Sequence, residues 1–280
     1  MHTPARWPTP RRRNVARPRV FCFLGRLFML RTLLLISATG LFLLLGSASA
    51  TFAAEAPVLR LNVSPQGYPP YTIVEGQETS GIIWDVAQRI TERLGYRLEA
   101  YKIPRKRVDD MLLEDYVDAT ARAKEWTDRP ERFVFTDPIV RVREVFFTLG
   151  EDKFVYDGPD DIGGKTILTH LGYKYPYLLK MFESKRAHRF DVPQDKDIFS
   201  YLLHGDDNFD LAIADKLVGQ WIIRKNGWRG KFSASDKALT DFGLRLMLRP
   251  EMNGFAKKFN AELATMKSSG ELDRIMDAYR

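Results

Sequence analysis

The chain has one cysteine, Cys22, among its 280 residues. A single cysteine excludes a disulfide-stapled scaffold and any zinc site built from cysteines. Four histidines are present, and neither the His-Glu-x-x-His pattern of metal-dependent hydrolases nor the Gly-x-Ser-x-Gly pattern of serine hydrolases occurs. The hydrophobic share of 45% and charged share of 28% are typical of a globular protein and exclude a disordered or collagen-like chain.

Beyond residue 50 the sequence also has almost no net charge. The whole chain carries a formal charge of +7, but residues 1–50 contain eight arginines and no acidic residue, which leaves −1 for the remainder. The basic character therefore belongs to the N-terminus. A nearly neutral domain argues against a protein that binds nucleic acid.

The N-terminal 50 residues have the pattern of an export signal. Arginines precede an uncharged apolar run at 32–45, which is shorter than the roughly 20 residues of a membrane-spanning helix. Small residues follow at Ala48-Ser49-Ala50. We predict a cleavable signal peptide at 1–50, and N-terminal sequencing of exported protein tests this. Cleavage after Ala53 or Ala54, a start at Met29, a twin-arginine route and an uncleaved anchor are the alternatives.

Strand-like and helix-like patterns alternate along the rest of the chain, which predicts an α/β protein with mostly parallel sheets. Ser80 is a candidate cap for the first helix. We expect strands at 59–63, 96–103, 117–121, 133–135, 145–149, 166–168, 209–214 and 244–248. We expect helices at 83–94, 108–114, 175–182, 198–204, 216–226 and 255–266, and a last one at 272–279. A polar break at 151–161 divides the elements into two series, so we expect two lobes with a binding cleft between them.

An ordered set of short motifs runs through both series. The first half contains Tyr68-Pro69-Pro70-Tyr71, Pro104-Arg105-Lys106-Arg107 and Asp128-Arg129-Pro130-Glu131-Arg132. The second half contains Leu171-Gly172-Tyr173-Lys174-Tyr175 and Phe209-Asp210-Leu211-Ala212-Ile213-Ala214-Asp215. Taken together over about 59–280, these motifs resemble the bacterial solute-binding proteins of family 3, which supply polar amino acids to ABC importers.

The resemblance implies a periplasmic-binding-protein type II fold, in which the chain crosses twice between two lobes. We place the crossings near Thr148–Asp152 and Asp236–Asp241. Lobe 1 is then predicted to comprise 57–149 plus 240–280, and lobe 2 to comprise 150–239.

The resemblance also implies the main ligand contacts. An arginine at the place of Arg129 grips a ligand carboxylate in the family, and a guanidinium suits this role because it donates two parallel hydrogen bonds and stays charged. The aspartate at the place of Asp215 receives a ligand ammonium group; here it follows an apolar strand and is also placed to cap the next helix.

Aromatic residues provide further candidates. Tyr68 and Tyr71 flank a proline pair and are candidates for packing on the ligand, with a rigid loop as the alternative. Gly172 and Tyr173 precede the expected helix at 175–182, so their backbone N–H groups are candidates for receiving an anion. His170 is a weaker candidate in the same loop.

The arginines depart from the family pattern. Ala121-Arg122-Ala123 stands where the family commonly has small hydroxyl residues, and Arg105 stands where members often carry an aromatic residue. Arg105, Arg107, Arg122 and Arg129 are therefore expected to approach one cleft, with solvated surface positions as the alternative. This surplus favours an anionic or zwitterionic ligand over a polyamine or a neutral sugar.

The resulting hypothesis is a monomeric periplasmic receptor for a small amino-acid-like ligand. It requires no metal or cofactor, and its partner is an ABC permease in the inner membrane. One alternative is an enzyme on the same scaffold, because some proteins that resemble this family are cyclohexadienyl dehydratases; that chemistry needs a positioned general acid. Another is a sensor that binds its ligand without feeding a transporter.

Overall fold

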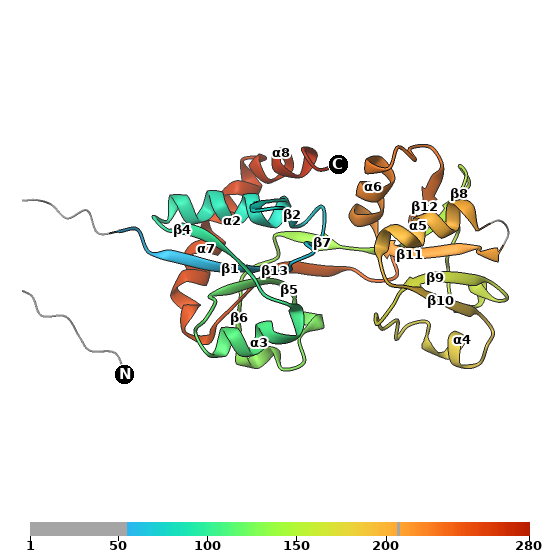
Figure 1. Ribbon diagram of the computed structural model, residues 1–280, viewed down its shortest axis with the longest axis horizontal. Helices are drawn as coiled ribbons and strands as arrows, with labels where there is room; N and C mark the ends of the chain where they lie inside the picture. The colour runs from blue at the N-terminus through green and yellow to red at the C-terminus, as the bar shows by residue number, and fades with distance from the viewer. Residues whose placement is uncertain (1–54, 206–207) are drawn as a thin grey trace, which may run out of the picture. The chain divides into compact units, whose positions relative to one another are not determined.

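The computed structural model in Figure 1 describes residues 55–205 and 208–280. The predicted signal peptide and its cleavage sites lie outside these residues. In the described part of the chain, no helix is both long and apolar enough to span a membrane.

The first lobe is built on a sheet in which β1 pairs in parallel with β4 and β5, while β13 runs antiparallel to β5, β6 and β7. The strands are β1 (Val58–Val63), β4 (Arg97–Lys102), β5 (Ala119–Ala123), β6 (Val134–Phe135), β7 (Val140–Val142) and β13 (Phe242–Leu248). A hairpin of β2 (Ile73–Glu75) and β3 (Glu78–Ser80) precedes the first helix. The helices are α2 (Ile82–Arg93), α3 (Arg105–Leu113), α7 (Asn253–Ser268) and α8 (Glu271–Asp277).

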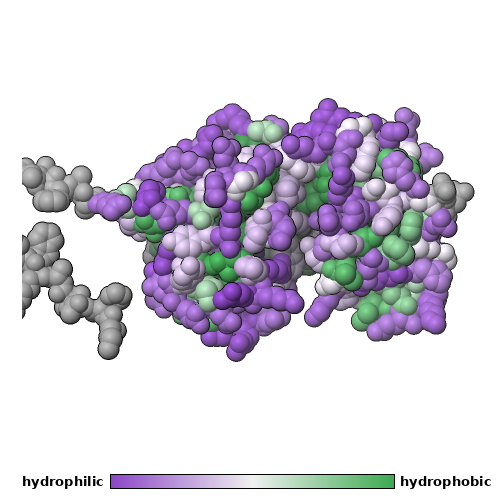
Figure 2. All heavy atoms as spheres, viewed as in Figure 1, coloured by the Kyte–Doolittle hydropathy of each residue, from purple (hydrophilic) through white to green (hydrophobic). Residues whose placement is uncertain are grey.

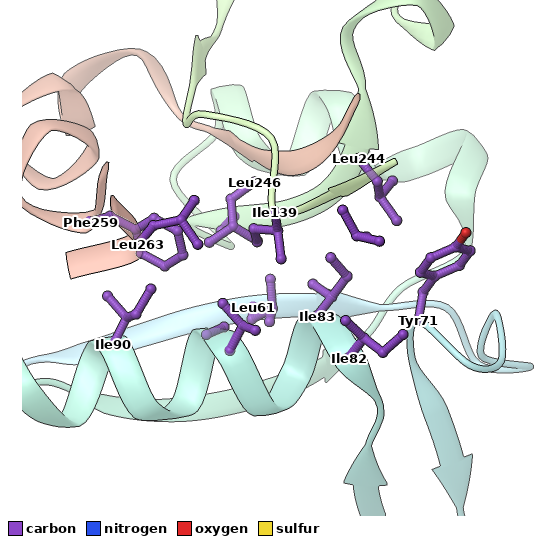
Figure 3. Packing of buried hydrophobic residues seen from close by; sticks show 14 of the residues in the cluster. Leu61, Tyr71, Ile82, Ile83, Ile90, Ile139, Leu244, Leu246, Phe259 and Leu263 are labelled. Carbon is purple, nitrogen blue, oxygen red and sulfur yellow. The ribbon is translucent and has the colours of Figure 1, made fainter. Parts of the chain in front are cut away.

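Helix α2 forms because its apolar residues recur with helical spacing and cover one face. Ile82, Ile83 and Ile90 are buried and share a cluster with residues of β1, β13 and α7, as Figure 3 shows. The expected cap at Ser80 is wrong, because Ser80 ends β3 and Gly81 is the N-cap residue. Gly81 has φ of 110°, and a Cβ atom there would lie 2.7 Å from the carbonyl oxygen of Tyr71. Only glycine fits this junction.

The second lobe is built on a sheet with the strand order β10-β9-β11-β8-β12. Strands β9 (Thr166–His170), β10 (His188–Val192) and β11 (Leu211–Asp215) are parallel. Strand β8 (Glu144–Leu149) pairs antiparallel with β11, and β12 (Phe232–Ala234) pairs antiparallel with β8. Helices α4 (Leu179–Glu183), α5 (Asp195–His204) and α6 (Lys216–Lys225) belong to this lobe. Its core holds the buried rings of Phe146, Phe147 and Phe199. Polar side chains cover much of the face seen in Figure 2.

The first crossing between the lobes lies at Arg143, between β7 of the first sheet and β8 of the second. Our prediction of a crossing near Thr148–Asp152, with 57–149 in lobe 1, is therefore wrong. The apolar run at 145–149 correctly predicts a strand, but its pattern does not tell which sheet the strand joins. The second passage runs from β12 to β13 through residues 235–241.

The expected helix at 175–182 begins only at Leu179. Tyr175 is buried and its hydroxyl accepts the backbone N–H of His170, while the Tyr177 hydroxyl donates to Glu144. These tertiary contacts accompany turns, not helix, before residue 179. The short strands β2, β3, β7, β10 and β12 also escaped prediction, because three to five residues give little periodic signal.

Candidate functional site

The parallel strands of the second lobe end together at one edge of the sheet. The ends of β9 and β10 are paired at His170 and Val192, and β11 lies on the other side of β9 and ends at Asp215. Ligands of open α/β sheets bind at such carboxyl ends. The loop from His170 to Tyr173 and the start of α5 at Asp195 therefore belong to the same edge as Asp215.

Asp215 is 6% exposed and its two oxygens accept several hydrogen bonds. Oδ1 accepts from the backbone N–H of Val218 at 3.0 Å and from the hydroxyl of Tyr71 at 2.8 Å, and Oδ2 accepts from the N–H of Arg143 at 2.8 Å. The predicted helix cap is confirmed, since Asp215 is the N-cap of α6. No cationic side chain of the described residues lies within 4.0 Å of the carboxylate.

Burial raises the pKa of Asp215 to about 6, although hydrogen bonds from Val218, Tyr71 and Arg143 act in the opposite direction. A buried carboxylate without a cation is costly to ionise. Asp215 is thus a site where a positive group on a ligand would be stabilised.

Tyr71 and Tyr68 of the first lobe lie next to this edge of the second lobe. Tyr71 is 1% exposed, and its hydroxyl reaches Asp215 from a loop 144 residues earlier in the chain. Tyr71 therefore bridges the lobes and does not present a free ring face. The half-buried ring of Tyr68 lies 5.2 Å from that of Tyr71. Burial raises the pKa of Tyr68, and Asp215, Tyr173, Tyr71 and Asp195 raise it further, so Tyr68 faces the acidic edge.

The helix start at residue 175 that supported our anion-site prediction for Gly172 and Tyr173 is wrong, because α4 begins at Leu179. Gly172 lies in a turn with φ of 83°, and α4 starts seven residues later. The ring of Tyr173 is stacked 4.2 Å from that of His170. Burial raises the pKa of Tyr173 to about 12, Asp195 raises it further and Arg105 lowers it. Tyr173 is accordingly close enough to sense both an acid of its own lobe and an arginine of the first lobe.

The four arginines are not equivalent. Arg122 is buried and its guanidinium pairs with Asp109 at 2.9 Å, and burial followed by repulsion from Arg105 lowers its pKa. Its charge is therefore already compensated inside the first lobe. Arg105, Arg107 and Arg129 are exposed, and no carboxylate of the described residues lies within 4.0 Å of their guanidinium groups. Arg105 also lies over the ring of Trp126, 5.8 Å from its centroid.

Two further acidic residues, Asp195 and Glu144, were not predicted from the sequence. Asp195 opens α5 directly after β10, and burial raises its pKa while His170 lowers it. Glu144 follows the first crossing and accepts hydrogen bonds from Tyr177 at 2.6 Å and Thr240 at 3.0 Å; burial raises its pKa. The signal for Asp195 was its place after a strand, but β10 itself was not predicted. Glu144 lies between a charged residue and an apolar strand, a pattern that carries no specific signal.

A comparison with protein families shows which family the chain is related to. Residues 59–280 match the model of the bacterial extracellular solute-binding proteins, family 3. The chain belongs to this family. The match covers nearly all of the described residues, so both lobes of this family 3 protein share the relationship.

Relatives of this family 3 protein are distant in sequence. PatH of Vibrio harveyi, a proposed amino-acid ABC transporter-binding protein, is 22% identical over 232 residues, covering 81% of this chain and 90% of PatH. A periplasmic binding protein of the third arginine transport system of Legionella pneumophila has a similar structure, with a TM-score of 0.61, 20% identity and coverage of 80% and 100%. A histidine kinase sensor domain is also similar, with a TM-score of 0.62, 20% identity and coverage of 80% and 96%.

These structures confirm the two-lobed type II periplasmic-binding-protein fold. The members of the family are solute-binding proteins, and PatH and the Legionella protein are named as binding proteins of transporters. Within the described residues, no group of histidine, cysteine, aspartate and glutamate side chains is arranged to hold a metal ion.

Proposed function

We propose that this protein captures a small zwitterionic, amino-acid-like ligand between its lobes and presents it to an ABC permease. The observation that carries the proposal is the buried carboxylate of Asp215, which has no cationic side chain within 4.0 Å in the described chain. A ligand ammonium group would supply the missing charge. Arg105, Arg107 and Arg129 offer exposed guanidinium groups on the first lobe for the ligand carboxylate.

The ion pair of Arg122 with Asp109 bears on which ligand charge we expect. Four arginines favoured an anionic or a zwitterionic ligand. Because Arg122 is paired with Asp109, only three of these arginines remain to attract a negative group of the ligand. Asp195 and Asp215 add acidic groups on the second lobe. A ligand carrying both signs fits this distribution better than a compound with several negative charges.

A matched ligand panel tests the proposal. Thermal unfolding is measured with an acidic, a neutral and a basic amino acid, with putrescine and with glucose. A ligand present at 100 times its dissociation constant stabilises the folded state by about 2.7 kcal/mol. We expect a stabilisation of this size, seen as a higher unfolding temperature, with at least one amino acid and not with putrescine or glucose. Stabilisation by putrescine or glucose alone would contradict the proposed site.

Binding is expected to weaken in mild acid. A ligand ammonium favours the ionised form of Asp215, whose pKa of about 6 means that most of it is protonated at pH 5. The affinity should fall roughly tenfold between pH 7 and pH 5, in line with the loss of the ionised fraction. Isothermal titration calorimetry with the best amino acid of the panel measures this.

Asp215→Asn tests whether the carboxyl group of Asp215 causes this pH dependence. The variant should bind more weakly at pH 7 and lose most of the dependence on pH. An unchanged pH profile in the variant would instead assign the titration to another group.

We also propose that the protein acts in the periplasm after removal of its N-terminal signal, as a monomer and without catalysis. Sensing without transport is the second candidate, favoured by the similarity over 80% of this chain to a histidine kinase sensor domain. Deletion of the ABC permease separates the two roles: uptake of the bound amino acid stops if the protein serves transport, whereas a sensory response persists.

A further inference from the structure

We propose that a contact between α6 and Tyr279, made toward the C-terminal end of α6 and away from its cap Asp215, forms a strap that joins the two lobes and resists their closure. The strap consists of Trp221 and Arg224 on α6 and of Tyr279, which follows α8. The proposal goes beyond the proposed function and does not depend on which ligand is bound.

Helix α6 is part of the second lobe but packs on the first. It follows β11 directly, with Asp215 as its cap, and it contacts α5. Val218 nevertheless belongs to the buried cluster of the first lobe, and Leu217 and Ile222 pack against the same cluster. One face of α6 thus packs on the first lobe.

Tyr279 is held firmly on the first lobe. Its hydroxyl donates to Oδ2 of Asp85 at 2.7 Å and accepts the backbone N–H of Gly81 at 2.9 Å, so it is tied to the beginning of α2. These two bonds fix the hydroxyl end of the Tyr279 ring. Tyr279 therefore acts as an anchor on the first lobe.

The second lobe grips this anchor by two contacts. Nη2 of Arg224 donates to the carbonyl oxygen of Tyr279 at 2.6 Å, and the rings of Trp221 and Tyr279 lie 6.1 Å apart. The guanidinium of Arg224 lies over Trp221, 4.8 Å from the ring centroid, which orients the charged donor toward Tyr279. A charged donor makes a stronger hydrogen bond than a neutral one.

The strap and two of the candidate ligand residues, Arg105 and Tyr173, lie on different sides of the crossing strands, whereas Asp215 caps the strap helix α6 at its other end. In Figure 1, α6 and the C-terminus lie on one side of β7 and β13, and α3 and α4 lie on the other. Arg105 begins α3 and Tyr173 lies in the loop before α4, and the positive charge of Arg105 lowers the pKa of Tyr173. A bend about the crossing strands that moves α3 toward α4 must pull α6 away from Tyr279. The strap therefore favours the open arrangement.

Distance measurements without ligand test the strap. The only cysteine is Cys22, so the full chain with Cys22→Ser accepts spin labels at Lys106→Cys on α3 and Glu183→Cys on α4, two exposed positions. Arg224→Ala should shift the α3–α4 distance distribution toward shorter values and raise the short-distance population about fivefold to tenfold, the change expected on losing one charge-assisted hydrogen bond. Tyr279→Phe, which frees the anchor from Asp85, should give a smaller shift in the same direction.

Two variants serve as controls. Arg229→Ala removes an exposed arginine of the same lobe and should leave the distribution unchanged, and Arg224→Lys keeps the charge if the alanine variant folds poorly. An unchanged or longer α3–α4 distance in folded Arg224→Ala would overturn the strap. Because no ligand is used, this result is separate from failure of the proposed function, which would appear as no amino acid binding in the panel.

Discussion

Replacing Asp118 by alanine is expected to destabilise the fold by about 2–4 kcal/mol, the cost of breaking a buried ion pair whose partners are partly exposed. The side chain of Asp118 is 4% exposed. It accepts hydrogen bonds from the backbone N–H and guanidinium of Arg60 and from the guanidinium of Arg249, at 2.8–2.9 Å. These residues lie on or beside β1, β5 and β13, so one carboxylate joins three neighbouring strands. Chemical denaturation measures the change.

The control is Asp115→Asn, which removes the charge and keeps a residue type that tolerates the φ of 57° at this position. Asp115 contacts the same arginines at 2.6 and 3.2 Å, but its side chain is 63% exposed. Exposed ion pairs contribute about 0–1 kcal/mol, so this variant should unfold almost like the wild type. Equal destabilisation by both variants would show that burial of Asp118 is not the cause.

The effect of Asp118 should also depend on pH. Burial alone would raise its pKa, but hydrogen bonds from Arg60 and Arg249 outweigh burial and lower it. A lowered pKa in the folded state adds stability above the pKa of the unfolded chain, about 4. The difference between wild type and Asp118→Ala should thus shrink as the pH falls below 4.

Arg129→Ala is expected to weaken binding of the best amino acid of the panel by about 2–5 kcal/mol, because the ligand carboxylate would be left without its charged partner. The free energy of unfolding should hardly change, since Arg129 is exposed and no carboxylate of the described residues lies within 4.0 Å of its guanidinium. Calorimetry gives the affinity, and denaturation gives the stability.

Arg132→Ala provides the comparison for Arg129. Arg132 is exposed at the end of the short turn Pro130–Arg132, which Arg129 directly precedes. It is not among the candidate ligand residues, so its loss should leave the affinity nearly unchanged. Full affinity in Arg129→Ala would remove Arg129 from the site. A similar loss in both variants would indicate a general effect of positive charge.

The two tyrosines of the first loop show where residue type alone is insufficient. Both were candidates for ligand packing, yet Tyr71 is buried and bonded to Asp215, whereas Tyr68 keeps a half-buried ring beside it. Both tyrosines flank the same proline pair, so their positions in the sequence do not tell which one is buried. The difference arises because only one of the two hydroxyl groups meets a carboxylate of the other lobe.

The sequence alone determined the features that depend on local pattern. The spacing of Ile83, Ala87, Ile90 and Leu94 predicted α2, and the apolar run before Asp215 predicted β11 and its cap on α6. The ordered motifs over 59–280 identified the family and hence the two-lobed fold. Such signals are contained within a few neighbouring residues or in their order along the chain.

Only the tertiary structure decided which partner each residue meets. It assigned β8 to the second sheet, paired Arg122 with Asp109 and brought Tyr71 to Asp215. It also delayed the start of α4 through the bonds of Tyr175 and Tyr177. Periodicity tells which face of an element is buried but not what covers it, because that choice depends on contacts between residues far apart in the chain.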